Sequence, residues 1–321
     1  MTDIITKLKI WIEMLKKHME AMGCSKRTLK DYPEQLKFFV EYIASIGLAD
    51  VNEITKDVIL NYQAYLYGYI NKRGKPISLE TQYGRLTPLR TLFRFLVRKG
   101  YFLYDPTSTL EMPKRKKNLP RGILERREMY KLLNQPNVDT PLGLRDKAML
   151  ELMYSSGIRS EELRNLKIYE VDTINQEMRI TQGKGGKDAI IPIGEIAAKY
   201  IDEYLKIARP KLFQYAEEVL HCRPQENNLL FITKGGKQIN AGNLIWVVGK
   251  YIKRAKIEKH ITPHCMRHSM AVHMLRSGAN LRVVQEMLRH SSIETTQIYT
   301  HIAINDLKRE HRKHHPREQS R

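Results

Sequence analysis

The sequence predicts a mainly α-helical protein with a small antiparallel β-sheet, divided between two domains. Residues 1–110 carry apolar side chains at helical spacing, whereas the chain from Glu125 onward mixes helical patterns with strand-like runs. Between them, residues 111–124 hold two prolines and five basic residues, a composition typical of an extended, solvated linker. We therefore expect a helical domain over 1–110, a basic linker over 111–124 and an α+β domain over 125–321.

Four helical segments account for the first domain. Apolar residues recur at helical spacing over residues 5–19, and three further segments follow candidate N-caps at Ser25, Thr55 and Ser78. Pro33 lies inside the second segment, where it should end the first turn or kink the helix. Four helices with basic faces would form a small bundle.

The second domain alternates between helical and strand-like patterns. The helices expected are residues 126–135, 144–156, 195–208, 241–256 and 267–277, then a segment that Asn280 caps and that runs to His290, and a short helix holding Tyr299. Residues 178–180 and 189–193 predict two strands joined by a glycine-rich turn, which places Lys184 at a hairpin tip.

The net charge predicts a polyanionic partner. The chain carries 55 Lys and Arg against 35 Asp and Glu, a formal charge of +20. Residues 1–124 hold 22 basic and 12 acidic residues, hence +10, which leaves +10 for the remainder. Charge that serves solubility alone is more often a near-neutral mix of signs. Two basic halves therefore favour a clamp on double-stranded DNA.

Three widely spaced cysteines, Cys24, Cys222 and Cys265, form no CxxC motif and predict a reducing compartment without disulfides or structural zinc. Neither a signal peptide nor a run of about 20 apolar residues is visible. A phosphate-binding Gly-x-x-x-x-Gly-Lys-Ser/Thr loop is also absent from the sequence. We expect a soluble cytoplasmic protein that uses no ATP and contacts no membrane.

Two basic residues sit in settings that allow either a surface role or a chemical one. Arg159 follows an apolar helix that breaks at Gly157, and Ser160 is a candidate cap for the next helix. An arginine at such a turn is more often a surface residue than a catalytic one. Exposed hairpin lysines are common, so Lys184 alone indicates little, but a lysine at a hairpin tip could also reach into a DNA groove and protonate a leaving oxygen.

Residues 262–300 gather the remaining candidates. His264 and Arg267 are three apart and would share a helix face, while His264 and His268 have the i, i+4 spacing of a zinc pair. We reject zinc because no Glu follows the first histidine and no third ligand is apparent. Tyr299 is one of 17 tyrosines, singled out by the His-Ser-Ser turn before it. Phosphate-binding arginine, proton-transferring histidine and nucleophilic tyrosine suggest covalent chemistry on a phosphodiester.

Together these motifs resemble those of the tyrosine recombinases, the phage-integrase and Xer-type family of site-specific DNA recombinases. The matching segments are Gly157-Ile158-Arg159-Ser160-Glu161-Glu162-Leu163, Gly183-Lys184-Gly185, His264-Cys265-Met266-Arg267-His268, Leu288-Arg289-His290-Ser291-Ser292 and Thr296-Gln297-Ile298-Tyr299-Thr300-His301. The resemblance implies a core-binding domain over 1–110 and a tyrosine-recombinase catalytic domain over 125–321. Arg289 stands where the family usually has glycine.

The resemblance also implies a reaction. Tyr299 would attack the scissile phosphorus and leave a 3′-phosphotyrosyl bond with a free 5′-hydroxyl. Arg159 and Arg267 would hold the non-bridging oxygens, and Lys184 would protonate the departing oxygen. His264 would take or return the tyrosine proton.

By the same resemblance, His290 would donate a hydrogen bond to a phosphate oxygen, and Glu162 would support the arginines rather than react. No metal or other cofactor is needed. Four protomers would act on two short inverted-repeat sites through a Holliday junction, as a homotetramer or with a related recombinase, at the nucleoid. Residues 302–307 would anchor each C-terminal segment on a neighbour.

Chromosome-dimer resolution and mobile-element integration or excision remain equally open as roles. Two alternatives stand beside recombination: a type IB topoisomerase-like enzyme that rejoins the same strand, and a catalytically silent DNA-binding regulator on the same fold.

Overall fold

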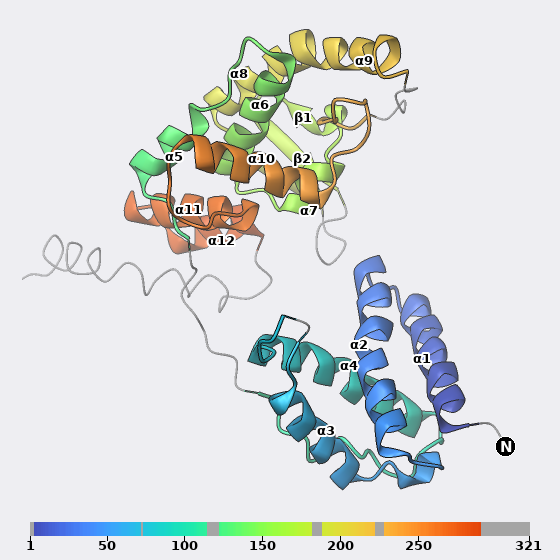
Figure 1. The fold of residues 1–321 in the computed structure, drawn as a ribbon. Helices are drawn as coiled ribbons and strands as arrows, with labels where there is room; N and C mark the ends of the chain where they lie inside the picture. Colours follow the sequence, from blue (N-terminus) through green and yellow to red (C-terminus); the bar gives the residue numbers. More distant parts are fainter. Residues whose placement is uncertain (1–2, 72, 114–121, 182–187, 222–227, 290–321) are drawn as a thin grey trace, which may run out of the picture. The chain divides into compact units, whose positions relative to one another are not determined.

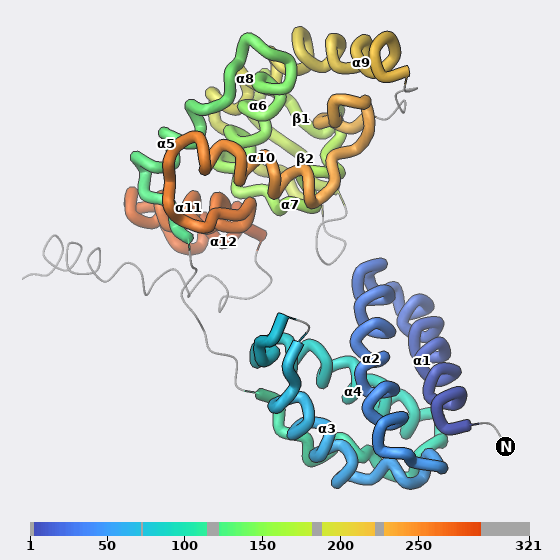
Figure 2. The backbone as a smooth tube through the Cα atoms, viewed as in Figure 1, coloured from blue at the N-terminus to red at the C-terminus, as the bar shows by residue number. Residues whose placement is uncertain are grey.

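A computed structural model describes residues 3–71, 73–113, 122–181, 188–221 and 228–289. The chain divides into two compact units, residues 1–116 and 117–321. Each unit has its own apolar core. The structure is mainly helical with one small antiparallel sheet, so the predicted fold class is confirmed (Figures 1 and 2).

The first unit is a bundle of four helices. They are α1 (Ile4–Ala21), α2 (Lys26–Ile46), α3 (Lys56–Gly68) and α4 (Leu79–Arg98), with a 3₁₀ turn, η1 (Val51–Glu53), before α3. The hydroxyls of Ser25 and Ser78 accept hydrogen bonds from backbone N–H groups in the first turns of α2 and α4. These two caps are confirmed, whereas Thr55 occupies the N-cap position of α3 without a side-chain bond.

Pro33 does not end a helix, because α2 runs through it without a break. Of the two expectations for Pro33, an end to the first turn was wrong, and a kink stays a prediction. Pro88 lies inside α4 in the same way. Helix α2 also contributes Phe39 to the core, where it is buried and packs edge-on against Tyr62 and Phe93 from the other helices.

The second unit surrounds a three-stranded antiparallel sheet in the order β1-β2-β3. Its elements are α5 (Arg126–Leu133), α6 (Pro141–Ser156), α7 (Ser160–Asn165), η2 (Ile168–Glu170), β1 (Val171–Asp172), β2 (Glu177–Ile180), β3 (Ala189–Pro192), α8 (Glu195–Glu203), a π turn η3 (Tyr204–Ala208), α9 (Arg209–Glu218), α10 (Ala241–Arg254), α11 (Pro263–Arg276) and α12 (Leu281–Leu288). The pairing of the two predicted strands is confirmed, since Met178 of β2 pairs with Ile191 of β3, whereas the glycine-rich turn between them lies outside the described residues.

Helix α6 is the centre of the second unit, and it packs against α8, α9 and α11 (Figure 1). It is buried around its circumference, including three charged side chains in its first two turns. The buried Asp146 carboxylate accepts hydrogen bonds from Arg145 and from the Tyr251 hydroxyl of α10, the latter at 2.8 Å. Pairing of this kind removes the penalty of a lone buried charge.

Three helix boundaries differ from the sequence expectations by three residues or more. Helices α6 and α11 begin earlier than predicted, at Pro141 and Pro263, because proline suits the first position of a helix. The helix expected to end at residue 208 instead continues through η3 into α9. Within the described residues, no helix is long and apolar enough to cross a membrane.

Both ends of the predicted linker are packed. Gln63 donates a hydrogen bond to the carbonyl of Glu111 at 2.7 Å, and Leu110 belongs to the core of the first unit. At the other end, Leu124 is fully buried in the core of the second. Residues 114–121, which hold the five basic residues of this segment, lie outside the described residues.

Candidate active site

The turn between α6 and α7 carries the first arginine motif. Gly157 ends α6 in the left-handed conformation, with φ +61°, and a Cβ there would collide with the Met270 side chain. Arg159, not Ser160, is the N-cap of α7. The predicted serine cap was wrong because the Glu162 carboxylate accepts the Arg159 backbone N–H at 2.9 Å and so supplies the capping bond.

The Arg159 guanidinium is held at both ends of its fork. Its Nη1 donates to Glu162 Oε1 at 3.0 Å, and its Nη2 donates to the carbonyl oxygen of Arg289 at 2.8 Å. The second contact joins α7 to the end of α12, 130 residues further along the chain. Two contacts of fixed direction hold the planar group in one orientation.

Arg267 approaches the same place from α11. Its side chain is buried, and its two terminal nitrogens donate to the carbonyl oxygens of Gly157 and Leu288. Arg267 and Arg159 therefore donate to the consecutive carbonyls of Leu288 and Arg289, respectively. The structure brings together two predicted site residues that are 108 positions apart in the sequence (267 minus 159).

Arg289 adds a third guanidinium to this cluster. It ends α12 with φ +50°, in the left-handed region where glycine is the usual residue, and its side chain pairs with Glu162 Oε2. Burial alone would raise the pKa of the Glu162 carboxyl. The bond from the Arg159 backbone and the charges of Arg289 and Arg159 outweigh burial and lower that pKa. The carboxylate is therefore ionised at neutral pH.

The cluster of Arg159, Arg267, Arg289 and Glu162 holds three positive charges and one negative charge. The cluster therefore has an excess of two positive charges, and its guanidinium groups only donate hydrogen bonds. Both properties suit an anion such as a phosphodiester. The sequence motifs predicted Arg159 and Arg267 for this role. The contact of Arg289 with Glu162 was not expected from the sequence.

The two histidines of the His-x-x-Arg segment differ in exposure. His264 is exposed in the first turn of α11, one turn before the buried Arg267. Burial, with the charges of His264 and Arg267 beside it, lowers the pKa of His268 from 6.5 to about 4, so His268 is neutral at pH 7. The remaining predicted site residues, Lys184, His290 and Tyr299, lie outside the described residues.

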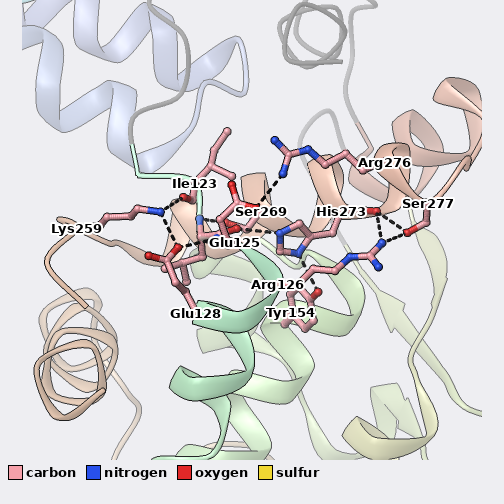
Figure 3. Close-up of polar contacts among 11 residues, drawn as sticks. Ile123, Glu125, Arg126, Glu128, Tyr154, Lys259, Ser269, His273, Arg276 and Ser277 are labelled. Carbon is pink, nitrogen blue, oxygen red and sulfur yellow. Dashed lines mark hydrogen bonds and ion pairs between the residues drawn. The ribbon is translucent and has the colours of Figure 1, made fainter. Parts of the chain in front are cut away.

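A second polar cluster ties the start of this unit to α11 (Figure 3). His273 Nε2 lies 2.8 Å from the Leu124 carbonyl, and its Nδ1 lies 2.9 Å from the Tyr154 hydroxyl. A carbonyl only accepts, so Nε2 carries the proton and Nδ1 accepts from Tyr154. The backbone N–H of Leu124 in turn donates to Ser269 at 2.9 Å. Sequence reasoning missed His273, since a histidine on an apolar helix face gives no signal of its partners.

Ionic contacts complete this second cluster. Lys259 donates to Glu128 at 2.6 Å and to the carbonyl of Ile123 at 3.2 Å, and Arg276 pairs with Glu125 at 3.1 Å (Figure 3). They fasten residues 123–128 to α11 and to the segment before it, and α11 is the helix that carries Arg267. Among the described residues, no group of three or more His, Cys, Asp or Glu side chains is arranged to hold a metal ion.

Comparison with protein-family models finds two matches that together span most of the chain. Residues 123–305 match the phage integrase family, and residues 10–112 match the phage integrase SAM-like domain. The first match contains every site residue that the sequence motifs singled out.

Two relatives that match most of the chain indicate the same family. Tyrosine recombinase XerC 2 of Ralstonia nicotianae is 37% identical over 305 residues, covering 94% of this chain and 85% of that protein. Tyrosine recombinase XerD of Listeria monocytogenes is 37% identical over 299 residues, covering 92% and 94%. A crystal structure of XerH site-specific recombinase bound to a palindromic difH substrate shares the fold, with a TM-score of 0.76, 20% identity and 97% coverage of both chains. The chain therefore belongs to the phage integrase family of tyrosine recombinases.

Proposed function

We propose that this enzyme is a site-specific DNA recombinase that cuts and rejoins double-stranded DNA through a 3′-phosphotyrosyl intermediate at Tyr299. The observation that carries the proposal is the convergence of Arg159 and Arg267 on consecutive carbonyls at the end of α12. Tyr299 follows that point by ten residues in the sequence (299 minus 289).

The arginines supply positioning and charge. Phosphoryl transfer needs little covalent chemistry from the protein beyond the nucleophile, and much of the catalysis comes from holding the phosphate and stabilising its charge. Arg159 and Arg267 hold the two non-bridging oxygens, and Glu162 fixes the Arg159 fork. His290 adds a further hydrogen bond to a phosphate oxygen.

The covalent step balances as a single displacement. The Tyr299 hydroxyl oxygen attacks phosphorus while its proton passes to His264. The bond from phosphorus to the 5′ oxygen breaks, and Lys184 gives that oxygen a proton. His264 is exposed in the first turn of α11, which supports its role in this proton transfer. Attack by a 5′-hydroxyl from a partner duplex reverses the step and rejoins the strands in a new pairing. The bond energy is conserved throughout, so no ATP is used.

Structures of related proteins support a DNA core site as the partner. Besides the XerH complex, a λ integrase dimer bound to a COC′ core site shares the fold, with a TM-score of 0.65 and 18% identity. For this chain we propose a short inverted repeat bound at the nucleoid in the cytoplasm. Four protomers, alone or with a related recombinase, would pair two such sites and pass through a Holliday junction.

The test is covalent capture. The wild type and Tyr299→Phe are expressed in a bacterial host with DNA from the source organism, and protein-linked DNA is isolated under denaturing conditions and sequenced. We expect adducts from the wild type alone, with ends clustered at one inverted repeat. Ends scattered without sequence preference would support a topoisomerase-like activity. DNA binding by both proteins without any adduct would support a silent regulator.

A further inference from the structure

Arg289 closes a ring of contacts around Arg159. Nη1 of Arg159 donates to Glu162 Oε1 at 3.0 Å, Glu162 Oε2 pairs with the Arg289 side chain, and the Arg289 carbonyl accepts from Arg159 Nη2 at 2.8 Å. We propose that Arg289 is a positioning residue that holds the Arg159 fork toward the scissile phosphate. This inference rests on the proposed function, because that function makes the scissile phosphate the target of Arg159.

Two features of Arg289 indicate that this ring of contacts has a functional role. Its backbone adopts φ +50°, a conformation that a residue with a β-carbon disfavours, so glycine would fit the turn with less strain. Its ion pair with Glu162 is sheltered, since the two side chains are 13% and 11% exposed. A sheltered pair is screened little by salt and holds its geometry better than a surface pair.

A direct contact between Arg289 and DNA is the competing explanation. The Arg289 fork is directed at Glu162, and its Nε is buried with no hydrogen-bond partner among the described residues. The bond to Glu162 uses Nη2 alone, so a phosphate contact would have to use the remaining N–H groups of Arg289. The two explanations predict different measurements: a phosphate contact changes DNA affinity and its salt dependence, whereas positioning changes the rate of cleavage.

The experiment compares Arg289→Ala with the wild type on a duplex that carries the inverted repeat recovered by covalent capture. One strand is nicked beside the cleavage point, so that the released 5′-hydroxyl fragment dissociates and the adduct accumulates. With DNA saturating, we expect Arg289→Ala to form the adduct about ten- to a hundredfold more slowly, the scale of a small misplacement of a catalytic group. The Kd and its salt slope should not change. Arg289→Lys, which keeps the charge opposite Glu162, should recover part of the rate.

A double-mutant cycle tests whether Arg289 acts through Glu162. If it does, Arg289→Ala should slow cleavage much less in a Glu162→Ala background than in the wild type, because the ring is already open. Independent, multiplicative losses, or a salt slope that falls by about one in Arg289→Ala, would overturn the proposal and establish a direct phosphate contact. Arg282→Ala is the matched control, since it removes an exposed arginine of the same helix whose ion pair, within the part of the chain that the structure describes, is with Glu286. It should cleave at the wild-type rate.

Arg289→Gly controls for the possibility that Arg289→Ala is slow because it is destabilised. Glycine suits the left-handed turn, so this variant should melt no lower than Arg289→Ala and yet remain slow. Wild-type cleavage by Arg289→Gly would refute the positioning role. The experiments distinguish failure of the proposed function from failure of the positioning role. If the wild type forms no Tyr299-dependent adduct, the proposed function fails; if it does and the Arg289 variants match it, only the positioning role fails.

Discussion

Replacement of Gly157 by alanine tests the packing of the turn that carries Arg159. A residue with a β-carbon at φ +61° costs about 1–2 kcal/mol relative to glycine. The added methyl would also collide with the tip of the buried Met270 side chain and lie 3.1 Å from Leu288 Cδ2. Because the methionine tip is flexible, this overpacking falls near the lower end of its usual range, about 1 kcal/mol. The expected destabilisation is about 2–3 kcal/mol.

The assay is thermal unfolding of the full chain, measured by calorimetry. A unit of this size should lose about 2–4 °C in Tm for each kcal/mol of destabilisation. Gly278→Ala is the matched control: its φ is +90°, but among the described residues no atom beyond its two chain neighbours lies within 4 Å of the added methyl. It should show the backbone cost alone, about 1–2 kcal/mol. A Gly157→Ala protein that melts no lower than the Gly278→Ala protein would refute the reasoning about Met270.

The remaining predictions concern other contacts. Ser78→Ala should destabilise the first unit by about 1 kcal/mol, because the α4 cap is lost; an unchanged urea midpoint would count against the cap. Tyr154→Phe should cost about 1–3 kcal/mol, because Nδ1 of the buried His273 loses its donor. Tyr130→Phe, at an exposed tyrosine, should cost nothing measurable in the same urea titration. The folded pKa of His268 lies below the unfolded value, so its contribution to stability is present above pH 6.5 and is lost as the pH falls toward about 4. That loss is at most about 3 kcal/mol, and His268→Gln should remove this part of the pH dependence.

The sequence predicted features that depend on local chemistry. Ser25, Ser78 and Asn280 were recognised as caps because a short polar side chain before an apolar run satisfies the backbone of the next turn. The convergence of Arg159 and Arg267 was anticipated only through a family resemblance, since nothing local relates residues 108 positions apart.

Features that depend on distant partners escaped prediction. Ser160 was expected to cap α7, but the Glu162 carboxylate satisfies the backbone from inside the helix. The roles of His273 and Arg289 are set by Tyr154 and Glu162, partners on other elements that sequence spacing does not reveal. The domain limits and the linker role of residues 111–124 stay predictions.

Identification of the covalently modified residue tests the central claim most directly. The wild type is incubated with a duplex carrying its captured site, the adduct is digested with trypsin and nuclease, and the nucleotide-bearing peptide is sequenced by mass spectrometry. Our account predicts a nucleotide attached through its 3′ phosphate to Tyr299, and a 5′-hydroxyl end that polynucleotide kinase can label. A nucleotide on another tyrosine, or one attached through a 5′ phosphate, would contradict it.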